Sequence, residues 1–81
     1  MEVTVYSTQT CPYCRQAEQF LTARGVAFNT IDVTDDDAMR DRLVEMSGGR
    51  RTVPQIFIDG RAIGEYTDLV ALPPSLFKTA P

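Results

Sequence analysis

The sequence predicts an α/β domain with a four-stranded mixed sheet and helices on both of its faces, in the order β-α-β-α-β-β-α. Residues 2–33 carry a strand pattern, a helix pattern and a second strand pattern in succession. Such a unit pairs its two strands in parallel through a right-handed crossover. Later, Asp59-Gly60 separates two short apolar runs, which is the signature of a two-residue hairpin turn. We therefore expect two parallel strands and a closing antiparallel hairpin.

Length and composition indicate one small globular domain over residues 1–81. Of the 81 residues, 43% are hydrophobic and 23% are charged, which excludes a disordered or fibrous chain. No apolar stretch is long enough to span a bilayer and no leader pattern opens the chain, so we expect a cytoplasmic protein with no membrane partner. The net charge of −3 argues against nucleic acid as a partner. Histidine is absent, which excludes a histidine general base.

The first strand is expected over residues 2–7, where apolar and polar side chains alternate. A helix follows from Cys11-Pro12 and ends at Gly25, because proline suits the first helical position and glycine suits the residue that closes a helix. The second strand is expected over residues 26–33. The apolar stripe of the helix comprises Tyr13, Ala17, Phe20, Leu21 and Ala23.

The acidic run Thr34-Asp35-Asp36-Asp37 predicts the start of a second helix, with Thr34 or Asp35 as its N-cap, rather than a metal site. This helix is expected to end at Ser47-Gly48-Gly49. The hairpin strands are expected over residues 55–58 and 61–63, and a last short helix over residues 69–72, before an irregular tail to residue 81. The buried face of the second helix is expected to comprise Ala38, Leu43, Val44 and Met46.

Two cysteines, Cys11 and Cys14, carry the only evident chemistry of the chain. A disulfide between them closes so short a loop that it barely constrains the unfolded chain, which disfavours a purely structural role. A zinc site needs four ligands, and the chain offers two thiols and no imidazole, so we expect no metal. A Cys-x-x-Cys pair in a reducing compartment is typical of reversible redox chemistry.

The position of the pair at a helix start assigns a role to each thiol. Cys11 lies at or next to the N-cap, where free backbone N–H groups favour the thiolate, so we expect it to be the nucleophile. Cys14 lies one turn inward and can attack a mixed disulfide formed at Cys11, which makes it the resolving thiol.

A second element, Thr52-Val53-Pro54, precedes a predicted strand. Because proline cannot donate to a sheet ladder, this segment needs a special conformation, and we predict that the Val53–Pro54 bond is cis. The backbone N–H and C=O of Val53 are then expected to face outward, unpaired, and to hold an extended substrate.

Three motifs together resemble a dithiol glutaredoxin of the thioredoxin-like superfamily: Cys11-Pro12-Tyr13-Cys14, residues 52–58 and residues 64–69. The resemblance implies the thioredoxin-like fold. It also implies a glutathione-dependent oxidoreductase that reduces glutathione mixed disulfides and protein disulfides. Glutathione is then a co-substrate and no cofactor is bound. The implied partners are glutathione and glutathionylated or disulfide-containing proteins, and the implied state is a monomer.

The resemblance also implies a set of glutathione contacts. The Val53 backbone pairs with the cysteinyl part of glutathione, and the start of the last helix, with the Asp68 side chain, takes its γ-glutamyl end. From the residues alone, Tyr13 is either a core aromatic or part of the substrate groove. The implied contacts are Tyr13, Thr52, Val53, Pro54, Tyr66, Thr67 and Asp68.

Two positions depart from the family pattern. Thr8 stands where members usually carry a basic residue, and Gly64-Glu65 stands where they usually carry Gly-Gly. Arg50 and Arg51 are either a replacement for the missing charge or a solvated basic pair. The departures keep two alternatives open. One is a redoxin that is reduced by thioredoxin reductase and donates electrons to ribonucleotide reductase, and the other is a [2Fe–2S] cluster carrier formed as a glutathione-ligated dimer.

Overall fold

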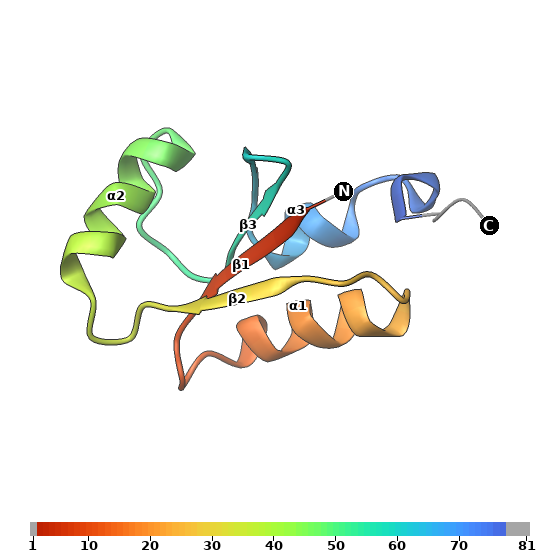
Figure 1. The fold of residues 1–81 in the computed structure, drawn as a ribbon, viewed down its shortest axis with the longest axis horizontal. Coiled ribbons are helices and arrows are strands. Elements are labelled where there is room, and N and C mark those ends of the chain that lie inside the picture. Colours follow the sequence, from red (N-terminus) through yellow and green to blue (C-terminus); the bar gives the residue numbers. More distant parts are fainter. Residues whose placement is uncertain (1, 78–81) are drawn as a thin grey trace.

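The computed structural model describes residues 2–77, and Figure 1 shows their arrangement. No helix within this range is long and apolar enough to cross a membrane. The elements are β1 (Val3–Ser7), α1 (Pro12–Ala23), β2 (Asn29–Asp32), α2 (Asp37–Ser47), β3 (Gln55–Ile58), β4 (Arg61–Gly64), α3 (Tyr66–Val70) and a short 3-10 helix (Pro74–Phe77).

The sheet has four strands in the order β2-β1-β3-β4. Strands β1 and β2 are parallel, whereas β1 and β3 and also β3 and β4 are antiparallel, which confirms the predicted mixed sheet. Asp59 and Gly60 have φ angles of 50° and 81°, as a type I′ hairpin turn requires.

Two apolar layers cover the two faces of the sheet, so helices lie on both faces as predicted. Helices α1 and α3 pack on one face through Ala17, Leu21 and Leu69, which meet Val3 and Val5 of β1. Helix α2 packs on the other face and lies apart from α1 and α3 (Figure 1). Because successive side chains of β1 point to opposite faces of the sheet, this strand contributes residues to both apolar layers.

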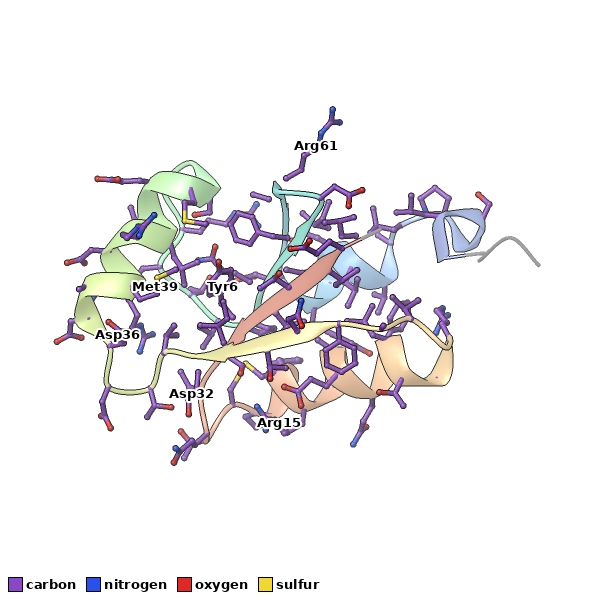
Figure 2. The ribbon with its side chains drawn as sticks, in the orientation of Figure 1. Tyr6, Arg15, Asp32, Asp36, Met39 and Arg61 are labelled. Atoms are coloured by element: carbon purple, nitrogen blue, oxygen red, sulfur yellow. The ribbon has the colours of Figure 1, made fainter. Side chains whose placement is uncertain are left out.

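The second layer is smaller and is built around an aromatic pair. The rings of Tyr6 and Phe57 meet edge to face with their centroids 5.4 Å apart. Leu43 of α2 is fully buried against them, and Met39 lies over Tyr6 from the α2 side (Figure 2).

The second helix corrects the prediction at its start. Its N-cap is Asp36, whose Oδ1 accepts a hydrogen bond of 2.9 Å from the Met39 N–H, and not Thr34 or Asp35. Thr34 instead donates its backbone N–H to Oδ1 of Asp32 at 2.8 Å. This local bond closes a turn before the helix, so the helix starts later than the acidic run suggests.

The buried face of α2 is also narrower than predicted. Only Leu43 is fully buried, Val44 is half-buried, and Ala38 and Met46 are exposed. A helix that packs on the sheet from one side buries a stripe of its surface, here Leu43 with the partly buried Met39 and Val44.

Other features of the helices and strands also differ from the prediction. Helix α3 begins at Tyr66 rather than at residue 69, because the Asp68 side chain accepts a hydrogen bond of 2.9 Å from the Glu65 N–H and caps the earlier turn. In α1, Tyr13 and Ala23 are exposed and leave the predicted stripe. The second strand is limited to Asn29–Asp32. The tail is predicted to be irregular, but Pro74–Phe77 form a 3-10 helix, and the tail beyond residue 77 lies outside the described residues.

Candidate active site

Sheet topology brings the cysteine pair and the proline segment together. Strands β1 and β3 are antiparallel neighbours with Tyr6 opposite Gln55. The chain that leaves β1 toward Cys11 therefore lies beside the chain that enters β3 from Pro54. Segments separated by about 40 residues meet at one end of the sheet.

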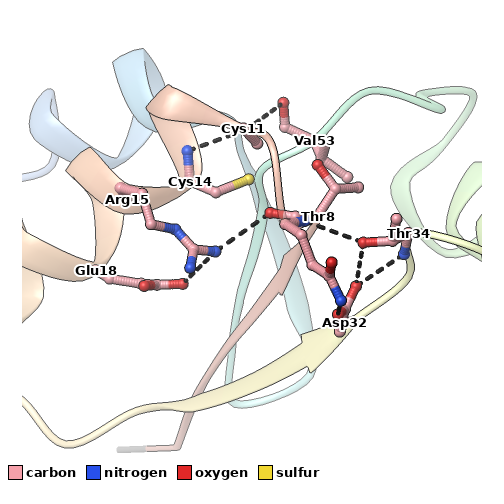
Figure 3. A network of polar contacts seen from close by, with 9 residues as sticks. Thr8, Cys11, Cys14, Arg15, Glu18, Asp32, Thr34 and Val53 are labelled. Carbon is pink, nitrogen blue, oxygen red and sulfur yellow. Dashed lines mark hydrogen bonds and ion pairs between the residues drawn. The ribbon is translucent and has the colours of Figure 1, made fainter.

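Cys11 is the N-cap of α1, as predicted. Its backbone is extended, with φ −105° and ψ 105°, and its Sγ accepts a hydrogen bond of 3.1 Å from the Cys14 N–H (Figure 3). Pro12 occupies the first helical position. The Cys11 sulfur thus accepts one of the backbone N–H groups that a helix start leaves without a partner inside the helix.

Cys14 lies in a different environment from Cys11. Its side chain is fully buried, whereas that of Cys11 is half-buried, and both are free thiols. Burial, and then the hydrogen bond with Cys11, raise the pKa of Cys14 to about 12. Cys14 is therefore a neutral thiol at physiological pH, and Cys11 is the thiol that a substrate can reach.

The Val53–Pro54 peptide bond is cis, which confirms the prediction. The orientation expected for Val53 holds in part. Its carbonyl is not unpaired, because it accepts a hydrogen bond from Cys11 Sγ at 3.8 Å (Figure 3). Its N–H has no partner within residues 2–77 and is available to a ligand.

A cavity of about 290 Å³ opens beside Val53. Tyr13 is 58% exposed and lies 6.1 Å from Tyr66, centroid to centroid, so it lines this groove rather than the core. The lining comprises Tyr13, Thr52, Val53, Pro54, Glu65, Tyr66 and Thr67. The structure thus brings together six of the seven predicted contacts and leaves out Asp68.

Asp68 is occupied by contacts within the protein. Its Oδ2 accepts from the Glu65 N–H and lies 3.2 Å from Nη1 of Arg50. The backbone N–H and then the Arg50 guanidinium hold the pKa of Asp68 below its ordinary value. This carboxylate caps α3 and pairs with Arg50 instead of lining the cavity.

Glu65 takes a place in the cavity that the predicted contacts did not include. It is half-buried, lines the cavity and accepts a hydrogen bond from the Thr52 hydroxyl. The signal was present, because Glu65 directly precedes two predicted contacts, Tyr66 and Thr67. At the position of the second glycine in the family pattern, the Glu65 carboxylate is predicted to repel the γ-glutamyl carboxylate of glutathione, although Glu65 is not among the predicted contacts.

Arg15 and Arg51 do not line the cavity, so neither of them supplies there the positive charge that is missing at Thr8. Arg51 pairs with Asp41 and lies 3.8 Å from Asp37, so it faces α2. Arg15 Nη2 donates to the Thr8 carbonyl at 3.3 Å and pairs with Glu18 at 3.2 Å. Arg15 thus holds a positive charge near Thr8 (Figure 3) and is not among the residues that line the cavity.

The turn before Cys11 is anchored to the end of β2. The Gln9 N–H donates to Thr34 Oγ1 at 3.0 Å, and its side-chain amide donates to Asp32 Oδ2 at 3.2 Å. The hydroxyl and then the N–H of Thr34 hold the pKa of Asp32 below its ordinary value. Sequence reasoning missed this network, which ties the loop that carries Cys11 to the sheet.

The fold and the site together define a class of protein. A dithiol at the start of α1, facing a cis proline at the start of a neighbouring strand, is the arrangement of a thioredoxin-like redox protein. Within residues 2–77 there is no group of three or more histidine, cysteine, aspartate or glutamate side chains that could hold a metal ion.

Comparison with known proteins identifies the family. A model of the glutaredoxin family matches residues 3–63. Glutaredoxin 3 of Escherichia coli strain K12 is 44% identical over 70 residues, which are 86% of this chain and 83% of that protein. The chain belongs to the glutaredoxin family, and its activity is that of a thiol–disulfide oxidoreductase.

Solved structures of glutaredoxins have the same fold. The buckwheat glutaredoxin–glutathione complex superimposes with a TM-score of 0.78 at 30% identity, over 84% of this chain and 64% of that chain. This chain therefore spans slightly less than two thirds of the buckwheat chain. Glutaredoxin 1 of Francisella tularensis, complexed with cacodylate, gives a TM-score of 0.76 at 34% identity, over 86% of this chain and 88% of that chain.

Proposed function

We propose that this protein reduces glutathione mixed disulfides and protein disulfides at the expense of glutathione. The observation that carries the proposal is the half-buried Cys11 thiol, whose Sγ lies 3.8 Å from the carbonyl oxygen of Val53, a residue that lines the cavity and whose N–H has no partner within residues 2–77. An extended peptide that pairs with this N–H has its cysteine sulfur next to Cys11. The structural likeness to a glutaredoxin–glutathione complex supports the same ligand.

The first step we propose is transfer of glutathione to the protein. The Cys11 thiolate attacks the glutathione sulfur of a mixed disulfide, so that a Cys11–glutathione disulfide forms and the bond to the substrate sulfur breaks. The substrate leaves as a thiolate and takes up a proton from water. The helix start stabilises the Cys11 thiolate before the attack and after its release.

The second step we propose restores the thiols. A second glutathione attacks the sulfur of the bound glutathione, which gives oxidised glutathione and free Cys11. Alternatively, Cys14 loses its proton and attacks the Cys11 sulfur, which gives the Cys11–Cys14 disulfide and releases glutathione. In this route the Cys14 proton passes to the departing glutathione thiolate, and burial, the largest cause of the raised pKa of Cys14, disfavours its loss.

The ligand contacts that we propose follow the cavity. The Val53 backbone pairs with the cysteinyl part, the rings of Tyr13 and Tyr66 flank the chain, and Thr52, Pro54 and Thr67 complete the walls. Asp68 acts from behind the cavity, beside Arg50. The donor is then present wherever glutathione keeps thiols reduced, as in the cytoplasm.

Substitution of each cysteine tests the assigned roles. Cys11→Ser removes the nucleophile, so transfer of glutathione from a mixed-disulfide peptide is expected to fall at least a hundredfold. Cys14→Ser is expected to keep this transfer and to accumulate a Cys11–glutathione disulfide that mass spectrometry detects. Full transfer activity in the Cys11→Ser protein would contradict the assignment.

A further inference from the structure

The cavity beside Cys11 contains one side chain that is charged at neutral pH. That side chain is Glu65, and the other lining residues are apolar or carry only hydroxyl groups. A charge on the wall of an otherwise neutral cavity acts on any charged group of the ligand. The lining contains no arginine or lysine that could offset it.

The Glu65 carboxylate is held in place. The Thr52 hydroxyl donates to its Oε1, and Thr52 directly precedes Val53 in the proline loop. The bond therefore joins the start of α3 to the segment that holds the ligand backbone. Because Glu65 is half-buried, its charge is screened less than that of a fully exposed carboxylate.

The two arginines that directly precede Thr52 are paired with other carboxylates. Arg50 lies 3.2 Å from Asp68, and Arg51 pairs with Asp41 on α2. Arg50 and Asp68 offset each other outside the lining, so Glu65 alone contributes an uncompensated charge to the α3 end of the cavity. The sum is one negative charge, which attracts an ammonium group and repels a carboxylate.

We propose that Glu65 is a specificity-determining residue that selects thiol moieties carrying an ammonium group, rather than a carboxylate, at the α3 end of the cavity. The inference rests on the proposed function, because it concerns the same cavity. A γ-glutamyl group carries both charges, so Glu65 attracts its ammonium and repels its carboxylate. The preferred substrate class is mixed disulfides of amine-bearing peptide thiols that lack this carboxylate.

The selection acts on binding and not on the sulfur chemistry. The same disulfide bond breaks and the same Cys11 disulfide forms with every thiol moiety, because the charge that Glu65 contacts is remote from the reacting sulfurs. The effect is therefore expected in KM, with kcat unchanged.

Three tripeptide thiols that differ only at this end provide the test. Each is attached to the same cysteine peptide as a mixed disulfide: γ-glutamyl-Cys-Gly, which is glutathione, its des-amino form glutaryl-Cys-Gly, and its decarboxylated form γ-aminobutyryl-Cys-Gly. Mass spectrometry follows release of the peptide thiol over successive turnovers, with glutathione, glutathione reductase and NADPH present at the same concentrations in every assay to return Cys11 to the free thiol. The kcat/KM is expected to be highest for the γ-aminobutyryl form and lowest for the glutaryl form, with about a threefold change per charge.

The Glu65→Gln variant removes the charge and keeps the size of the side chain. The kcat/KM values of the three thiols are then expected to agree within about twofold. Glu45→Gln is the matched control, because it removes the same charge from an exposed position on α2. Glu45→Gln is expected to keep the wild-type order. High salt is also expected to reduce the differences in kcat/KM among the three thiols in the wild type, and this test needs no variant.

The outcomes separate the two proposals. Equal kcat/KM for the three thiols in the wild type overturns the role of Glu65 and leaves the glutathione reaction in place. An order that survives Glu65→Gln also overturns this role. Failure of the wild type to release peptide from all three mixed disulfides overturns the proposed function, and the inference with it.

Discussion

Cys11 and Cys14 lie one helical turn apart in opposite environments. Cys11 is half-buried at the N-cap with its sulfur accepting a backbone N–H, whereas Cys14 is fully buried beneath it. Burial penalises the charged form of Cys14 and raises the pKa of that thiol. The asymmetry between the two thiols follows from their depth in the structure and needs no histidine or other base.

The buried thiol makes stability depend on pH in the alkaline range. The pKa of Cys14 is about 12 in the folded protein against 9.0 as its ordinary value, so the unfolded chain loses this proton first. The contribution of Cys14 to the free energy of unfolding is complete below pH 9 and is lost as pH rises from 9 toward 12. The expected slope is at most about 1.4 kcal/mol per pH unit.

Urea unfolding of the reduced protein between pH 8 and pH 10.5 measures this slope. Cys14→Ala removes the titrating group and is expected to show a shallower decline than the wild type. Parallel curves for the two proteins would show that the Cys14 thiol titrates alike in the folded and unfolded states.

Helix α3 depends on the glycine that precedes it. Gly64 has a φ angle of 127°, a conformation that side chains rarely adopt. A Cβ atom there would lie 2.7 Å from Cγ of Asp68 and 2.9 Å from Nη1 of Arg50. A Cβ atom at Gly64 would therefore displace the Asp68 carboxylate, which caps α3, and the Arg50 guanidinium that pairs with it.

Gly64→Ala is expected to destabilise the protein more than Gly49→Ala. Gly49 has a similar φ of 121°, but a Cβ atom there meets nothing within 4 Å, so this variant carries the backbone cost alone. The additional loss for Gly64→Ala is expected to be about 1–3 kcal/mol, the usual cost of overpacking. Thermal and urea unfolding measure both variants, and equal losses would contradict the contact with Asp68.

Individual elements differ in how well the sequence predicts them. The strand–helix–strand order and the Asp59-Gly60 turn follow from local periodicity and turn chemistry, which are properties of short segments. The start of α2 is less predictable, because Asp35 and Asp36 are equally good caps. The choice between them depends on the bond between Thr34 and Asp32.

The site as a whole is assembled from the start of α1, the segment before β3 and the start of α3. This assembly explains which contacts could be predicted. The pairing of β1 with β3 brings Cys11 to Val53, and the motifs that carry the resemblance identified both. The position of charged side chains around the cavity depends on pairing between distant residues, such as Arg50 with Asp68 and Thr52 with Glu65. The sequence motifs do not determine these side-chain pairs, so the motifs predict Asp68 as a ligand contact, whereas in the structure Glu65 lines the cavity and Asp68 does not.

At the scale of the whole molecule, the central claim is that glutathione supplies the electrons. A coupled assay tests this claim most directly. Purified protein is mixed with a glutathione mixed disulfide and NADPH, together with either glutathione and glutathione reductase or thioredoxin reductase alone. NADPH oxidation that depends on Cys11 and proceeds with the glutathione system is the expected result. Turnover sustained only by thioredoxin reductase would contradict glutathione as the donor.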